Sequence, residues 1–200
     1  MNRTGINESK KLILRDNIKK AYGLQNAFVL IFHGTLNYAP NMHAVENLTR
    51  LLPQIIKKYP NVYLLLMGKN PPKISSPHII LTGFVENPFD YIAIADLAVV
   101  PLTSGGGTKL KMLQYLACGK AIVATTKAAE GLELENNKDA LICKNPDSEL
   151  VNLVFKVIEN PQLRKMLGAN ARKKAELLYD WEHNAQKAIA VYQNLISAQS

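Results

Sequence analysis

Two patterns of hydrophobic positions follow one another along the chain. Short continuous apolar runs rich in β-branched residues are typical of strands buried on both faces of a parallel sheet. Longer segments repeat apolar residues at helical spacing. The runs predict strands at 28–32, 62–67, 78–81, 97–100, 121–124 and 140–143. The periodic segments predict helices at 10–22, 41–58, 88–94, 147–159, 161–178 and 181–196, with one more after the strand at 97–100. This alternation predicts an α/β fold, a Rossmann-like doubly wound parallel sheet followed by C-terminal helices.

Composition narrows the class of protein without naming a function. The 200 residues are 48% hydrophobic and 20% charged, which is ordinary for one soluble globular α/β unit. The net charge of +8 permits an acidic partner such as a nucleotide phosphate, anionic lipid or nucleic acid. The lysines come in scattered pairs on segments expected to be helical, which is typical of a solvated face. We therefore expect no nucleic-acid partner.

The N-terminus and the cysteines indicate a compartment. The opening MNRTGINESKK is polar and lacks the apolar core of a signal peptide, and no run is long enough to span a bilayer. Two cysteines, Cys118 and Cys143, give no disulfide framework. These observations predict a cytoplasmic protein.

The segment Val99–Thr125, VVPLTSGGGTKLKMLQYLACGKAIVAT, carries the clearest chemical signal. Three glycines, Gly105 to Gly107, stand where the chain leaves a strand and enters a helix, so a ligand can approach the backbone amides there. Thr108 is a candidate cap for that helix, and Lys109 places a cation in its first turn. A cation there is unfavourable unless an anion binds beside it. The pattern predicts a phosphate on a helix N-terminus, although the dinucleotide-fold and P-loop spacings are both absent.

These residues resemble the donor-binding segment of retaining glycosyltransferases of the GT-B architecture, in the group 1 or family 4 type. The stretch GGGTKLKMLQYLACGKAIVAT is similar to that family's GGGTRLKxLEAxAxGKPVVAT, and AEGL at 129–132 fits its next loop. Upstream, HGTLNYAPNMHAVENL resembles a GSxxxxPNxDA pattern, and Met67-Gly68 and LTGFVEN at 81–87 fit in order. The resemblance covers roughly residues 26 to 195.

The resemblance implies a glycosyltransferase of the hexosyltransferase type that uses a nucleoside diphosphate sugar, with a UDP- or GDP-sugar expected. It implies no cofactor and no bound metal, and the four histidines lack metal-ligand spacing. Lys109 would assist catalysis by stabilising the leaving diphosphate. Lys111 is expected at the surface. The implied donor-contacting residues are Gly34, Thr35, Gly83, Phe84, Val85, Gly105, Gly106, Gly107, Thr108, Lys109, Leu110, Gln114 and Glu130.

The sequence departs from the family pattern in two places. Many relatives carry two glutamates where this chain has Gly106 and Gln114, and an amide accepts ribose hydroxyls less well than a carboxylate does. Many also carry an arginine and a lysine where this chain has Thr35 and Asn41, and Asn41 is equally a candidate N-cap. Two alternatives therefore stay open: a catalytically degenerate GT-B module that serves assembly or regulation, and a nucleotide-sugar epimerase.

The resemblance also implies a domain organisation. Residues 1–25 would form a linker with an N-terminal helix, 26–178 the donor-binding domain, and 179–200 a helix that packs on an N-terminal acceptor domain. That domain is absent from this sequence, so we expect this half to be inactive alone. The acceptor would be a glycan or a lipid-linked molecule bound through that domain. Such an acceptor allows peripheral association with the inner face of a membrane.

Overall fold

The sheet at the centre of the molecule has six parallel strands. The computed structural model describes residues 8–197; parts of the predicted linker and of the predicted C-terminal helix lie outside that range. The sheet order is β3-β2-β1-β4-β5-β6, with every pair parallel. The strands are β1 (Phe28–His33), β2 (Val62–Met67), β3 (Ile79–Gly83), β4 (Leu97–Val100), β5 (Ala121–Thr125) and β6 (Leu141–Cys143). The predicted Rossmann-like sheet is thus confirmed.

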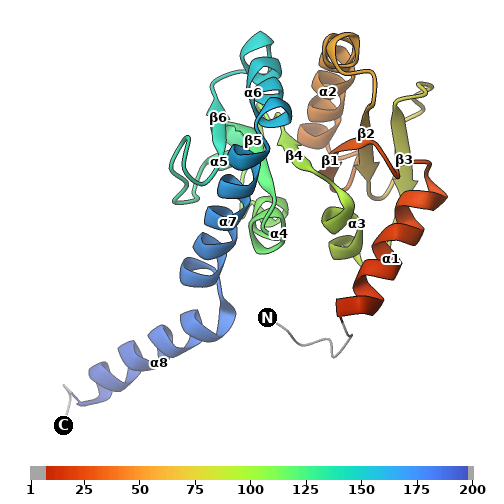
Figure 1. Cartoon of the computed structure of the whole chain (residues 1–200). Helices are drawn as coiled ribbons and strands as arrows, with labels where there is room; N and C mark the ends of the chain where they lie inside the picture. The colour runs from red at the N-terminus through yellow and green to blue at the C-terminus, as the bar shows by residue number, and fades with distance from the viewer. Residues whose placement is uncertain (1–7, 198–200) are drawn as a thin grey trace.

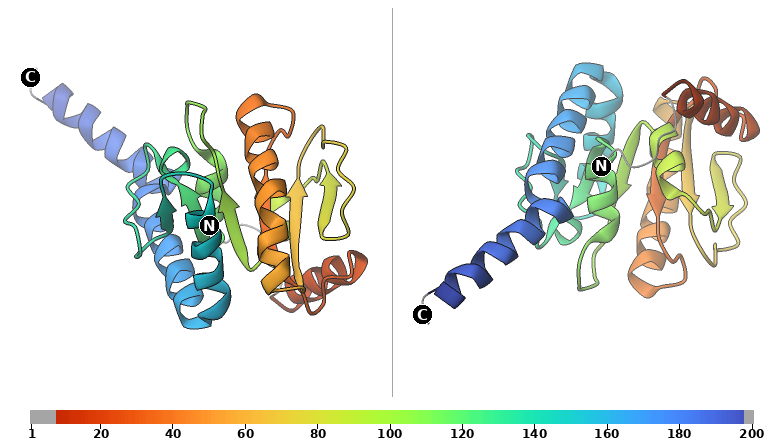
Figure 2. Two further views of the ribbon diagram at one scale, coloured as in Figure 1. Left: turned by 90° about the horizontal axis from the view of Figure 1, so that it is seen from above. Right: turned by 90° about the horizontal axis from the view of Figure 1, so that it is seen from below.

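Helices cover both faces of this sheet. They are α1 (Glu8–Ala21), α2 (Ala39–Lys58), α3 (Pro88–Ile94), α4 (Leu110–Ala117), α5 (Thr126–Ala129), α6 (Ser148–Glu159), α7 (Pro161–Leu178) and α8 (Trp181–Ser197). Figures 1 and 2 show α2 and α6 on one face and α1, α3 and α4 on the other, while α8 projects away from the body. None of the helices within residues 8–197 combines the length and the apolar character needed to cross a membrane.

The burial of the central strands explains why they could be predicted from the sequence. Every residue of β4 and β5 is buried, and so is all of β1 after Phe28, because helices lie on both sides. The edge strand β3 is only half-buried along its length. A strand covered on both faces needs apolar side chains at every position, so the signal is a continuous run rather than an alternation.

The predicted element boundaries are confirmed to within two residues, with two local corrections. The helix after the glycine loop begins at Leu110, with Lys109 at its N-cap and no side-chain cap, so the prediction that Thr108 caps it is wrong. The helix predicted from Asn41 begins at Ala39 with Tyr38 at the N-cap. Asn41 therefore lies inside the first turn of α2 and is not its cap.

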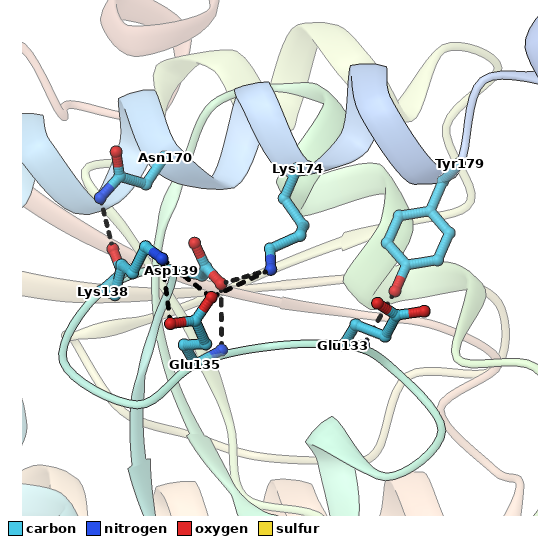
Figure 3. Close-up of polar contacts among 7 residues, drawn as sticks. All are labelled: Glu133, Glu135, Lys138, Asp139, Asn170, Lys174 and Tyr179. Carbon is cyan, nitrogen blue, oxygen red and sulfur yellow. Dashed lines mark hydrogen bonds and ion pairs between the residues drawn. The ribbon is translucent and has the colours of Figure 1, made fainter.

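A long loop between α5 and β6 is fastened to α7 by side chains, as Figure 3 shows. Tyr179 accepts a hydrogen bond from the Glu133 backbone at 3.0 Å, and Asn170 donates to the Lys138 carbonyl at 2.8 Å. The buried Asp139 carboxylate lies 3.1 Å from the Lys174 ammonium. These contacts hold 133–139 against α7 without regular secondary structure.

Candidate functional site

A cavity of about 250 Å³ lies beyond the carboxyl ends of β1 and β4. In the order 3-2-1-4-5-6, these are the neighbouring strands from which the chain winds in opposite directions, and ligands of open α/β sheets bind at that switch point. The loop after β1 and the loop after β4 form its two walls. Its lining residues are His33, Gly34, Tyr38, Pro40, Asn41, Leu102, Ser104, Gly105, Gly106, Thr108, Lys109, Leu110, Lys111 and Gln114.

The glycine-rich loop closes one side of the cavity against the start of α2. Gly105 has a φ of +103°, and a Cβ placed on it would lie 3.2 Å from the Pro40 ring. A larger residue would therefore be strained and crowded there. The backbone of this loop passes directly into α4, whose N-terminus has no side-chain cap. Its positive end is thus available to an anion.

Lys109 is packed into this loop. Its side chain is only 8% exposed, and its ammonium donates to the Gly105 carbonyl at 3.3 Å. The lysine thus lies against the glycine loop and is one of the residues that line the cavity. This position agrees with the expectation that a cation lies beside the glycines. The role of Lys109 in stabilising the leaving diphosphate stays a prediction.

Lys111 is a correction to the sequence analysis, because it lies in the cavity wall and not at the surface. Its ammonium donates to the Asn41 side-chain oxygen at 2.5 Å and lies 4.0 Å from the centre of the buried Phe32 ring. Asn41 in turn donates to the Thr35 carbonyl at 2.8 Å. Burial, with a smaller contribution from Lys109, lowers the pKa of Lys111 to about 7.

A buried hydrogen-bonded group joins the end of β1 to α4. The His33 ring contacts the Tyr115 hydroxyl through Nδ1 and the Gln114 oxygen Oε1 through Nε2, each at 2.7 Å. The same hydroxyl accepts the His33 backbone N–H at 3.0 Å. Burial is the main cause that lowers the pKa of His33 to about 4, so the imidazole is neutral at pH 7.

The charge of the lining is one-sided. It contains two lysines, Lys109 and Lys111, and neither aspartate nor glutamate. Within the described range 8–197, no group of histidine, cysteine and acidic side chains is arranged to hold a metal ion. The cavity is therefore suited to an anion held by backbone amides and ammonium groups.

The structure brings together about half of the predicted donor-contacting residues. Gly34, Gly105, Gly106, Thr108, Lys109, Leu110 and Gln114 line the cavity, whereas Thr35, Gly83, Phe84, Val85, Gly107 and Glu130 lie outside its lining. Phe84 is 64% exposed, with the Lys69 ammonium 4.9 Å from its ring centre. Glu130 is exposed and pairs with Lys127 at 2.6 Å.

Among the lining residues outside the predicted donor-contacting set, three form the hydrogen bonds described above: His33, Asn41 and Lys111. One signal was available for Lys111. It precedes Gln114 by three positions and Tyr115 by four, a spacing that puts all three on one side of a helix. A helix that directs Gln114 at a ligand therefore directs Lys111 there as well.

Comparison with known proteins gives the family. Residues 27–160 match the family described as glycosyl transferases group 1. An uncharacterized glycosyltransferase of Methanocaldococcus jannaschii is 28% identical over 122 residues, which are 60% of this chain and 31% of that protein. The structure is similar to that of HepE from Anabaena in complex with UDP, with a TM-score of 0.75, 18% identity, and coverage of 91% of this chain and 53% of HepE.

A third protein matches over most of its own length. The C-terminal domain of the group 1 protein LpcC from Francisella tularensis has a TM-score of 0.63 and 16% identity, over 76% of this chain and 86% of that domain. By contrast, this chain spans about a third of the Methanocaldococcus protein and half of HepE. The Rossmann-like half of a GT-B enzyme thus accounts for the fold, and since the family match covers more than half of the sequence, the chain belongs to the group 1 glycosyl transferases.

Proposed function

We propose that this chain binds the nucleoside diphosphate sugar of a glycosyltransferase that transfers the sugar to an acceptor hydroxyl. One observation carries the proposal: the switch-point cavity is lined by a glycine-rich loop, an uncapped helix N-terminus and two lysines, without a carboxylate. A diphosphate fits this lining, because its oxygens accept hydrogen bonds from backbone amides and its negative charge neutralises both ammonium groups. The UDP complex of HepE supports the same ligand class.

The proposed chemistry needs leaving-group stabilisation from this half of the enzyme. The bond between the anomeric carbon and the diphosphate oxygen breaks while the acceptor oxygen bonds to the same sugar face, so configuration is retained. The acceptor proton passes to the departing diphosphate. Lys109 and Lys111 would stabilise the negative charge that develops on that diphosphate. Cations that are already in place before the reaction lower the barrier effectively in this way.

The epimerase alternative has less support. It needs acid and base groups beside the sugar, and the cavity lining contains no carboxylate. The histidine of the lining, His33, forms hydrogen bonds with Tyr115 and Gln114, and burial lowers its pKa to about 4. The degenerate-module alternative is favoured by two departures from the resembled family pattern, the amide of Gln114 in place of a glutamate and Thr35 in place of an arginine.

The test is a calorimetric and thermal-shift screen of this chain against UDP, GDP, ADP, CMP and dTDP without added metal. A ligand at one hundred times its Kd should add about 2.7 kcal/mol to the free energy of unfolding. We expect one diphosphate to bind selectively and Lys109→Ala to weaken it about tenfold, through loss of a charged contact. Lys57→Ala, an exposed lysine in the last turn of α2, is the matched control. Folded protein that binds none of the five would favour the degenerate module.

The rest of the proposed activity lies outside this chain. The acceptor, a glycan or a lipid-linked molecule, would be bound by the part of the enzyme that this chain does not span. We also propose that α8 contacts that part, because it projects from the body and exposes Trp181, Tyr192 and Ile196. A lipid-linked acceptor would place the enzyme at the inner face of a membrane, as a peripheral protein.

A further inference from the structure

The buried group at the end of β1 arises where two strands separate. β1 pairs with β4 only at Leu30 and Ile31, so the later residue His33 has no partner on that side of the sheet. Its backbone N–H donates to the Tyr115 hydroxyl of α4 instead. That hydroxyl is fully buried and also contacts the His33 ring, so one phenol group serves two atoms of one residue.

Counting protons fixes the direction of each hydrogen bond. The Tyr115 oxygen accepts the backbone N–H of His33, and its own proton needs an acceptor because the group is buried. Among the described residues, the ring nitrogen Nδ1 of His33 is the acceptor within reach, at 2.7 Å. The reverse direction would leave a buried O–H without a hydrogen-bond acceptor, which is unfavourable. Nδ1 is therefore unprotonated.

The proton of the imidazole is then on Nε2. A neutral histidine carries one ring proton, and burial keeps this ring neutral near pH 7. Nε2 donates to Gln114, whose facing atom must be the carbonyl oxygen Oε1. The side-chain amide nitrogen of Gln114 consequently points away from His33. It makes no hydrogen bond to another residue described in the structure, although Gln114 lines the cavity.

We propose that Tyr115 and His33 are positioning residues that hold Gln114 with its amide nitrogen toward the ligand, so that Gln114 donates a hydrogen bond to an oxygen of the nucleotide. The identity of the ligand as a nucleoside diphosphate rests on the proposed function; the direction of the hydrogen bonds does not. A glutamate at this position would act in the opposite sense, since a carboxylate only accepts. A glutamine at position 114 thus presents a hydrogen-bond donor to the ligand where a glutamate would present an acceptor.

The direction of the hydrogen bonds is tested in the free protein. Nitrogen-15 NMR of the histidine rings distinguishes a protonated from an unprotonated ring nitrogen, and loss of the signal in His33→Gln assigns it. We expect His33 at pH 7 to have protonated Nε2 and unprotonated Nδ1. In Tyr115→Phe, which removes the hydroxyl proton, we expect a mixture of both tautomers. A wild-type ring with the proton on Nδ1, or on both nitrogens, would overturn the proposal whether or not Tyr115→Phe folds.

The role of the amide is tested by nucleotide affinity, with the diphosphate that binds best in the screen above. Gln114→Met keeps the length of the side chain without a donor and should weaken binding about five- to tenfold. Gln114→Glu should weaken it at least about tenfold, because a second anion then faces the nucleotide. Gln54→Glu, an exposed position on α2, makes the same charge change away from the cavity.

The outcomes separate the two proposals. Equal or tighter binding by Gln114→Glu would show that this position acts as an acceptor and would overturn the inference while leaving the proposed function intact. Absence of nucleotide binding by the wild-type chain would instead remove the proposed function and, with it, the nucleotide as the partner of Gln114. The tautomer of His33 is measured without any ligand and stands apart from that result.

Discussion

Replacing Lys111 with methionine is expected to weaken binding of the nucleoside diphosphate on the order of 100-fold at slightly acidic pH. The ammonium of Lys111 lies between Asn41 and the Phe32 ring, partly withdrawn from water, where a charged contact is worth about 2–3 kcal/mol. Methionine fills the same space without the charge, so the fold should persist. Titration calorimetry of Lys111→Met against the wild type measures the loss, and Lys57→Met is the control.

The same residue should make binding depend on pH. Burial lowers the pKa of Lys111 to about 7, so the free ammonium loses its proton as the pH rises above that value. A bound diphosphate favours the charged form and raises the pKa, so binding near pH 8 should take up a proton and affinity should decline with rising pH. Calorimetry in buffers of different ionisation enthalpy measures the uptake. Uptake that persists in Lys111→Met would show that another group takes the proton.

Stability should change with pH in the opposite direction. The folded pKa of Lys111 is about 7 against 10.5 in an ordinary lysine, so between these values the unfolded chain binds more protons than the folded chain. The free energy of unfolding contributed by this group therefore rises with pH across that window, by on the order of 2–4 kcal/mol. Urea unfolding of the wild type and of Lys111→Met at pH 7 and pH 10 measures this rise as the difference between the two proteins. Both proteins share the opposing effect of Cys118 and Cys143, whose pKa values are raised by burial, and the added effect of Lys120, whose pKa is lowered by burial.

Gly68→Ala is expected to destabilise the chain by at least about 4 kcal/mol, the largest effect of any single methyl group that we anticipate. A Cβ on Gly68 would lie 1.8 Å from the backbone oxygen of Gly34, and neither backbone can yield without moving the end of a central strand. Gly34 lines the cavity, so any surviving fold should also bind nucleotide more weakly. Denaturant unfolding followed by circular dichroism measures the change.

Gly131→Ala separates crowding from backbone strain. Gly68 has a φ of +142° and Gly131 a φ of +77°, but a Cβ on Gly131 meets nothing within 4 Å. We expect this variant to lose only about 1 kcal/mol, the cost of a left-handed conformation for an L-residue. Equal losses for the two alanines would contradict the explanation from crowding.

The fold was predictable from sequence because burial acts on every residue of a central strand. The run Leu97 to Val100 is apolar without interruption because helices cover both faces, and the predicted bounds match β4. The order of the strands was not predicted, because the same alternation with right-handed connections is compatible with more than one order of a doubly wound sheet. The short helix α5 was not predicted, since its four residues, Thr126 to Ala129, are too few for a periodic signal.

The site was only partly predictable because it depends on contacts between distant segments. The glycine loop and Lys109 were predictable because they lie at a recognisable spacing within one continuous segment of the sequence. Lys111 and Asn41 are 70 positions apart in sequence, and their hydrogen bond exists only because the first turns of α2 and α4 meet at the switch point. A lone asparagine after a proline is therefore equally compatible with a helix cap, and tertiary packing decides between the two.

The short pairing between β1 and β4 has a consequence for how the molecule resists opening. β1 meets β2 over the six residues 28–33, but meets β4 only at Leu30 and Ile31. The sheet thus consists of two three-stranded halves, and the seam between them runs beneath the cavity. Cooperative units of unfolding commonly follow such boundaries. Because the walls of the cavity come from opposite sides of the seam, a ligand bound there would contact both halves and oppose their separation.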